Sequence, residues 1–181
     1  MSPITHFLMG WALANTAPSL NKTERAIVTW ASYEIQLAAE RVEAAAKAAR
    51  SLPFPFTLTA RAETYVRGRL DLDQTIKRLV AYEKAGADVL FAPGLPDLAA
   101  VRAVCSAVSK PVNFAVGIRD KSFSVAEIAA AGVKRISFAA SLYRAAMTGL
   151  CEAAREAKEK GTFGYLAQTM TTAELSSFLP Q

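Results

Sequence analysis

The sequence predicts an α/β fold, namely a partial (half) TIM-type β/α barrel with four parallel strands and flanking helices. Two observations predict it: short apolar runs follow one another along the chain, and an amphipathic helical pattern follows each run. The runs are residues 53–61, 87–94, 110–116 and 133–140. Strands that alternate with helices in this way form parallel sheets. A closed barrel of this type has about eight strand-helix units, so this chain supplies half of one.

Capping residues and helix breakers delimit the expected helices of the first half. The stretch from Ser32 to Arg50 is rich in Ala, Glu, Lys and Arg and has small apolar residues on one face, so it predicts a helix that Pro53 ends. Asp71 stands three residues before Gln74, a spacing typical of a helix start. Gly86 ends the helix that begins there, because glycine accepts the left-handed conformation that follows many helices.

The later part of the chain carries further helical patterns. A helix is expected over residues 95–108, and the pair Ser124 and Glu127 has capping-box spacing before the next one. The pattern over residues 141–160 places leucine and alanine on one stripe and predicts a long helix. A weak helical pattern starts near Thr172.

Composition is that of an ordinary globular protein with one domain-sized core. Of the 181 residues, 52% are hydrophobic and 20% are charged, which excludes a disordered chain. The formal net charge is +5, but Lys and Arg are dispersed among Asp and Glu, so we expect no nucleic acid partner. Cys105 and Cys151 lack metal-ligand or redox spacing, which predicts buried or half-buried reduced thiols in a cytoplasmic protein.

Residues 1–30 differ from the rest and form an expected apolar leader. The apolar stretch from Ile4 to Ala17 is interrupted by polar residues and is shorter than the ~20 residues of a membrane span, so a membrane-anchor role is the weakest alternative. No basic segment precedes it, which argues against a signal peptide. We expect a leader (1–30), a half β/α barrel (31–165) and a C-terminal tail (166–181).

Alternation along the strands brings polar residues to one face of the predicted sheet. Arg61, Asn113 and Ser137 fall on this face near the carboxyl ends of their strands, where parallel sheets bind ligands. Small hydroxyl residues also fill tapering barrel interiors, and for Thr57 and Ser137 we favour that structural role. Arg61 differs, because a guanidinium inside a sheet must meet an anion or cost several kcal/mol. Arg61 is therefore the first candidate for ligand binding.

Segments that follow one another along the chain resemble a known family. They are AAERVEAAAKAAR, LTARAE, DLDQTIKRLVAYEKAGADVLFAPGL, KPVNFAV and GVKRIS. Their order, over about residues 31–165, is similar to the later half of the isocitrate lyase/phosphoenolpyruvate mutase superfamily. The resemblance implies a β/α barrel and a carbon-carbon or phosphorus-carbon lyase, for example one like 2-methylisocitrate lyase. Such enzymes act on small α-oxycarboxylates with Mg²⁺ through an enolate or pyruvate-like species.

The resemblance implies roles only where residues match. Arg61 in LTARAE stands where the family has the arginine that holds the substrate's carboxylate or phosphonate, and Glu63 where it has a supporting acid. The lyases' glutamate near Pro93 is absent, and Ala115 replaces their asparagine, with Asn113 two residues earlier. No catalytic or metal residue is assigned. The expected substrate-binding residues are Arg61, Glu63, Asn113 and Ser137.

The superfamily's Mg²⁺ ligands are expected to be absent from this chain. The resemblance places them on strands of the first half, whereas Glu24 is the one carboxylate within residues 1–30. Asp71 and Asp73 have D-x-D spacing but stand at a helix start, where capping is the better interpretation. The chain therefore resembles the second half of an enzyme joined to an unrelated leader, and we expect it to be inactive alone.

The leader has a short resemblance of its own. MSPITHFLMGWALA is similar to the start of membrane-associated metal-dependent hydrolases, which implies a metal ligand at His6. His6 is the sole histidine of the chain, so a structural or surface role is favoured. A gene fusion, a frameshift remnant or a mis-set start would each produce this pattern.

Two functions remain open. The first is a lyase-family protein in which Arg61 anchors a small carboxylate, and the alternative is a non-catalytic anion-binding or structural half-barrel that oligomerises. An open parallel sheet leaves unpaired edges and an uncovered face, which a second copy or the leader would cover. The resemblance also implies that the last helix exchanges between subunits of a homo-oligomer. The residues expected in that contact are Leu142, Tyr143, Ala146 and Leu150.

Overall fold

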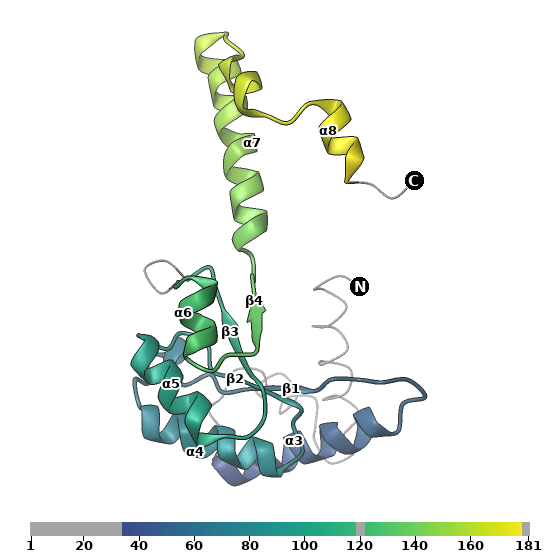
Figure 1. The fold of residues 1–181 in the computed structure, drawn as a ribbon, viewed down its shortest axis with the longest axis vertical. Helices are drawn as coiled ribbons and strands as arrows, with labels where there is room; N and C mark the ends of the chain where they lie inside the picture. The colour runs from purple at the N-terminus through teal and green to yellow at the C-terminus, as the bar shows by residue number, and fades with distance from the viewer. Residues whose placement is uncertain (1–33, 119–121, 179–181) are drawn as a thin grey trace, which may run out of the picture. The chain divides into compact units, whose positions relative to one another are not determined.

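The computed structural model describes residues 34–118 and 122–178, so the expected leader with His6 and Glu24 lies outside the described residues. The described strands form one sheet in the order β1-β2-β3-β4, with parallel pairing between neighbours (Figure 1). Their bounds are Thr59–Arg61 (β1), Val89–Phe91 (β2), Val112–Ala115 (β3) and Arg135–Ser137 (β4). Each strand lies inside a predicted apolar run, which confirms the predicted four-stranded parallel α/β fold.

Helices alternate with the strands in the predicted order. They are α3 (Ile35–Arg50), α4 (Leu72–Lys84), α5 (Leu98–Ala107), α6 (Val125–Ala130), α7 (Ser141–Lys160) and α8 (Thr172–Ser177), with 3-10 helices η1 (Tyr65–Arg67) and η2 (Gly164–Gln168). The chain divides into two compact units, Met1–Ser137 and Phe138–Gln181. The borders expected near residues 30 and 165 stay predictions.

Side-chain caps begin the helices where the sequence places them. The Asp71 carboxylate accepts a hydrogen bond from the Gln74 backbone N–H at 2.9 Å and starts α4. Ser124 and Glu127 form the predicted capping box of α6, in which each side chain accepts from the other residue's backbone N–H. These bonds satisfy donors that the first helical turn leaves unpaired, which contributes about 1 kcal/mol at each helix start.

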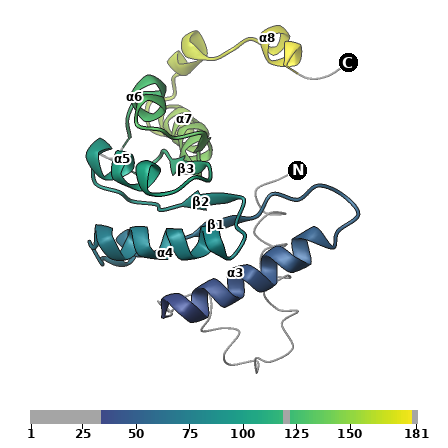
Figure 2. The ribbon, with the colours of Figure 1, turned by 60° about the horizontal axis from the view of Figure 1, so that its bottom comes forward.

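One face of the sheet packs against helices and forms the core of the first unit. Leu90 of β2 and Phe114 of β3 are buried together with Leu79 of α4 and Val104 of α5. Figure 2 shows α4 beside β1 and β2. Burying a side chain of this size stabilises a fold by about 1.5–3 kcal/mol. The helix-facing side of the sheet therefore carries the apolar core, and the other side carries polar residues such as Asn113.

The second unit, Phe138–Gln181, consists of α7 and the segment that follows it, and hydrogen bonds to Glu156 hold the two together. The Glu156 carboxylate accepts hydrogen bonds from the Thr162 hydroxyl at 2.7 Å and from the backbone N–H groups of Gly164 and Tyr165 at 2.6 and 3.2 Å. These bonds fold η2 back onto α7, and they lower the pKa of Glu156, with the Thr162 bond as the largest cause. α7 contains no buried residue.

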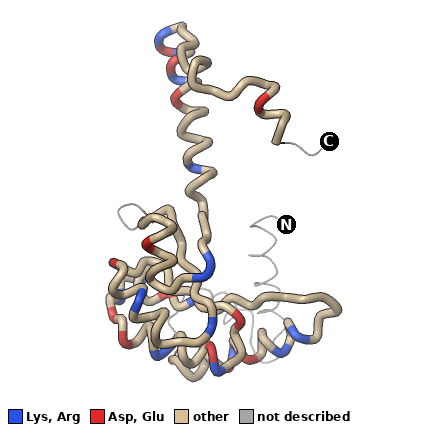
Figure 3. Tube along the Cα trace, viewed as in Figure 1, with Lys and Arg blue, Asp and Glu red and all other residues tan. Residues whose placement is uncertain are grey.

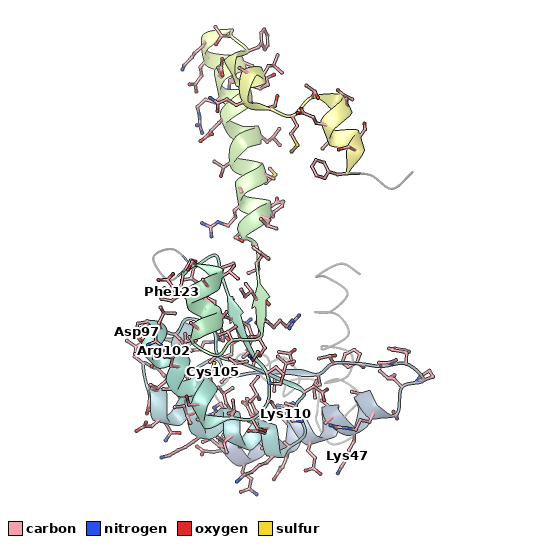
Figure 4. The ribbon with its side chains drawn as sticks, in the orientation of Figure 1. Lys47, Asp97, Arg102, Cys105, Lys110 and Phe123 are labelled. Atoms are coloured by element: carbon pink, nitrogen blue, oxygen red, sulfur yellow. The ribbon has the colours of Figure 1, made fainter. Side chains whose placement is uncertain are left out.

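The two cysteines are free thiols in different environments. Cys105 lies on α5, is half-buried as predicted, and has a thiol pKa raised by that burial (Figure 4). The prediction is wrong for Cys151, which is exposed. The physical reason is that Cys151 belongs to α7, a helix without buried residues.

Charged side chains of both signs are interspersed along the helices. Figure 3 shows Lys and Arg alternating with Asp and Glu over the described part of the first unit. Mixed charges of this kind are typical of solvated helix faces. None of the helices within residues 34–118 and 122–178 combines the length and hydropathy that a membrane-spanning segment needs.

Candidate functional site

Four residues from the four strands form one row across the sheet. Arg61 pairs with Phe91, Phe91 pairs with Asn113, and Asn113 pairs with Arg135. Paired residues on neighbouring parallel strands project to the same face, so the row lies on the side opposite the helix-packed core. The alternation in the sequence correctly placed Arg61 and Asn113 on a common face. We call these four residues the polar row.

The Asn113 side chain is buried within this row and only partly satisfied. It is 2% exposed, and its Oδ1 accepts a hydrogen bond from the Ser137 hydroxyl at 2.9 Å. Ala115 pairs with Ser137 in the register, so the hydroxyl lies one row beyond Asn113 toward the carboxyl ends. Within the described residues, the Asn113 amide nitrogen has no acceptor. A buried amide donor without a partner costs about 1–3 kcal/mol, which marks this position as one that accepts a further group.

The Arg61 guanidinium is paired with the carboxylate of Glu63 and is half exposed, whereas the sequence analysis expected it inside the sheet. The Arg61 Nε atom forms an ion pair with Glu63 Oε1, and the guanidinium carbon lies 5.2 Å from the centre of the Phe91 ring. Glu63 Oε2 is also 3.5 Å from Nε of Arg67. The Arg61 side chain is 48% exposed, so solvent and small solutes reach it. Glu63 thus occupies the anion-binding side of Arg61 while it contacts a second arginine.

Arg135 is the member of the polar row that the sequence analysis did not select. Its Nη1 donates to the Thr59 hydroxyl at 3.3 Å, which links β4 to β1 across 76 residues of sequence. A simple signal for it existed, because Arg135 precedes Ser137 by two residues and alternation places both on one face. The sequence did not reveal that the side chain turns back over the sheet.

The turn after β2 is the place where the related lyases have a glutamate and this chain has Pro93 and Gly94. Pro93 is buried, and Gly94 has φ +84, a left-handed conformation that suits glycine. A Cβ added at Gly94 would lie 3.2 Å from Cγ1 of Val66 in η1. The turn after β2 therefore packs closely against η1 and has a structural role.

The described residues do not fit a Mg²⁺ site. Within residues 34–118 and 122–178, no group of three or more His, Cys, Asp or Glu side chains is close enough to hold a metal ion. Asp71 caps α4, which agrees with its predicted role, and Asp73 follows it in the first turn of that helix. Mg²⁺ needs near-octahedral oxygen ligands, whereas the polar row supplies the Asn113 amide oxygen and its neighbours Ser137 and Thr59 supply hydroxyls, without a cluster of carboxylates.

The fold and comparisons with known proteins identify the family. The described chain has parallel β/α units in one four-stranded sheet, an arrangement that β/α barrels contain. The sequence profile described as phosphoenolpyruvate phosphomutase matches residues 21–158. The chain therefore belongs to the phosphoenolpyruvate mutase family, within the phosphoenolpyruvate mutase/isocitrate lyase superfamily whose solved members are TIM-type barrels.

Solved structures agree with this assignment. A protein of Burkholderia cenocepacia J2315 assigned as a lyase/mutase is 46% identical, with a TM-score of 0.77 over 82% of this chain and 54% of that one. A protein of the same organism assigned as a phosphonomutase is 34% identical, with a TM-score of 0.62 over 68% and 51% of the two chains. Phosphonopyruvate hydrolase in complex with oxalate and Mg²⁺ shares the fold at 21% identity, with a TM-score of 0.64 over 80% and 52%.

The chain spans about half the length of these solved structures. A comparison with curated protein sequences gave no significant match. The fold and the family are thus established, and the activity of the whole protein is a separate question.

Proposed function

We propose that the polar face binds a small α-oxycarboxylate whose carboxylate or phosphonate pairs with Arg61, in a protein of the carbon-carbon or phosphorus-carbon lyase class. The observation that carries the proposal is the Arg61 guanidinium, which lies at the end of β1 over the Phe91 ring and is paired with the partly exposed carboxylate of Glu63. Membership of the phosphoenolpyruvate mutase family and the oxalate bound by phosphonopyruvate hydrolase support it. Acids related to 2-methylisocitrate fall within this ligand class.

Glu63 has a supporting role in this proposal. It contacts Arg61 and lies 3.5 Å from Arg67 Nε, so a ligand carboxylate can replace it on Arg61 while Arg67 retains it. Exchange of one ion pair for another avoids leaving a charge unpaired, which is the costly outcome for partly desolvated groups. Ser137 holds the Asn113 amide in place next to the ligand.

The reaction is proposed to need Mg²⁺, as the bound ion in phosphonopyruvate hydrolase suggests. The described residues do not fit such an ion, so the proposal routes no step through it. We propose that this chain by itself binds the acid without converting it. We propose a cytoplasmic location, which is supported by the free cysteines Cys105 and Cys151, since thiols stay reduced in that compartment.

Thermal unfolding of the full chain tests the binding part of the proposal. Oxalate at millimolar concentration should raise the melting temperature, because a ligand that binds only the folded state stabilises it. The Arg61→Ala variant should lose this shift, whereas Arg102→Ala, which removes an exposed arginine on α5, should retain it. An equal shift in both variants contradicts a binding role for Arg61.

Turnover is a separate measurement. The chain is incubated with Mg²⁺ and a panel that includes 2-methylisocitrate, oxaloacetate and phosphonopyruvate, and release of pyruvate, glyoxylate or oxalate is followed. We expect binding without release of product. Product formation above the rate of an Arg61→Ala control contradicts the proposed inactivity and supports the lyase activity directly.

A second candidate function is a non-catalytic half-barrel that oligomerises. Exposed apolar side chains on α7 favour it, since Leu142, Tyr143 and Leu150 are 60–67% exposed and large apolar patches mark contact surfaces. Light scattering should then give a mass of at least a dimer, and Leu150→Glu should shift it toward the monomer. A monomeric parent chain that binds oxalate contradicts this candidate and leaves the first one intact.

A further inference from the structure

Two donor groups on the polar face have no anionic partner within the described part of the chain. The Asn113 amide nitrogen is buried without an acceptor, although its oxygen is bonded to Ser137. Arg135 forms none of the ion pairs among described residues, and its one contact is the hydrogen bond to Thr59. A guanidinium has five N–H donors and stays protonated, so one hydroxyl leaves most of its donors unused.

These two donor groups are neighbours. Asn113 and Arg135 are paired residues on β3 and β4, so their side chains leave the same face about 4.8 Å apart. A carboxylate or phosphonate on this face can accept hydrogen bonds both from an amide N–H and from a guanidinium, whose long side chain can reach it from the next strand. The pairing combines charge from Arg135 with a buried, directional donor from Asn113.

This pair of donors is separate from the anion-binding side of Arg61. The Arg135 guanidinium is anchored at Thr59, two residues before Arg61 on the same face of β1. At about 3.3 Å per residue the two positions are roughly 7 Å apart along the strand. Arg61 instead turns toward Glu63 and the Phe91 ring. A ligand with two acidic groups a few bonds apart can therefore contact both arginines.

We propose that Arg135, together with the Asn113 amide, forms a second anion contact that makes this face select ligands with two acidic groups. The inference rests on the proposed function, because it assumes that Arg61 holds the first acidic group. Arg135 acts here as a specificity-determining residue. Loss of Arg135 should remove the preference for a diacid and leave the contact with a monoacid unchanged.

Calorimetric titration of the full chain with two matched probes tests the proposal. Malonate carries two carboxylates, and monomethyl malonate has the same carbon skeleton with one of them esterified. The parent chain should bind malonate about tenfold more tightly, because a charge-assisted hydrogen bond contributes about 1.5–3 kcal/mol. Arg135→Gln should bring the two affinities within about threefold by weakening malonate alone, whereas Arg61→Gln should weaken both probes.

Two control variants separate local from general effects. Arg102→Gln removes the same charge from α5, on the helix side of the sheet, and should keep the malonate preference (Figure 4). Arg135→Lys keeps the positive charge but lacks the planar guanidinium with its paired N–H donors, so it should retain part of the preference for malonate. Circular dichroism of each variant verifies the fold, which we expect to persist because Arg135 is exposed.

The outcomes distinguish this inference from the proposed function. If the parent chain binds neither probe, the proposed function fails and the second contact fails with it. If the parent binds both probes and Arg135→Gln or Arg135→Lys still prefers malonate by tenfold, the proposed function stands and the role of Arg135 is overturned. Loss of preference in Arg102→Gln as well would show a general charge effect and also overturn it.

Discussion

Ser137 on β4 donates its hydroxyl hydrogen to the Oδ1 atom of Asn113 on β3 at 2.9 Å, and this bond orients the buried amide of the polar row. Ser137→Ala should lower the free energy of unfolding by about 1–2 kcal/mol, because it leaves a buried carbonyl oxygen without a donor. Urea unfolding monitored by circular dichroism measures the change. Ser122→Ala, on an exposed residue, is the matched control, and equal effects of the two variants would contradict the structural role of the bond.

Thr75 and Thr64 form a buried hydroxyl pair with an oxygen separation of 2.5 Å, and Thr75 also donates to the Asp71 carbonyl at 2.7 Å. Thr75→Val keeps the shape of a fully buried side chain and deletes both hydrogen bonds. We expect a loss of about 1–3 kcal/mol in unfolding free energy, since the buried Thr64 hydroxyl loses its partner, while the Asp71 carbonyl still accepts from the backbone N–H of residue 75. Thr148→Val on exposed α7 should change stability by no more than about 0.5 kcal/mol.

Gly132 and Gly68 provide a pair of substitutions that separates crowding from backbone strain. Both have left-handed φ values, +99 and +77, but a Cβ at Gly132 would lie 2.9 Å from Cβ of Cys105, whereas nothing lies within 4 Å at Gly68. Gly68→Ala should cost about 1–2 kcal/mol from conformation alone. Gly132→Ala should cost about 1–3 kcal/mol more, because α5 must shift to accept the methyl group. Similar melting temperatures for the two variants would show that α5 moves freely.

Glu156 makes the α7 to η2 contact pH-dependent. Its pKa is lowered by the Thr162 hydroxyl and by the Gly164 backbone N–H, so the folded form favours the carboxylate. A carboxyl group whose pKa is lower in the folded than in the unfolded state stabilises the folded state at pH values above its unfolded pKa. This stabilisation is lost as the pH falls through the folded pKa. The Gly164 amide resonance in NMR spectra should therefore titrate with a midpoint below the ordinary glutamate pKa. Glu156→Gln should abolish this titration, and Glu159→Gln should leave it unchanged.

The local features of the fold could be predicted because they depend on residues close in sequence. Strand positions followed from apolar runs, and the starts of α4 and α6 followed from Asp71 and from the Ser124 and Glu127 pair. Alternation placed Arg61 and Asn113 on one face because the side-chain period of a strand is fixed. The exposure of Cys151 was not predictable, because it depends on what α7 packs against.

The amino-acid order by itself determined the succession of β/α units, the helix caps and the common face of Arg61 and Asn113, since each follows from short-range geometry and periodicity. Tertiary structure alone decided that Arg135 reaches Thr59 across 76 residues of sequence. It also decided that the Asn113 amide is buried with one end unpaired. Those contacts depend on the order and register of the strands, which no local pattern of the chain encodes.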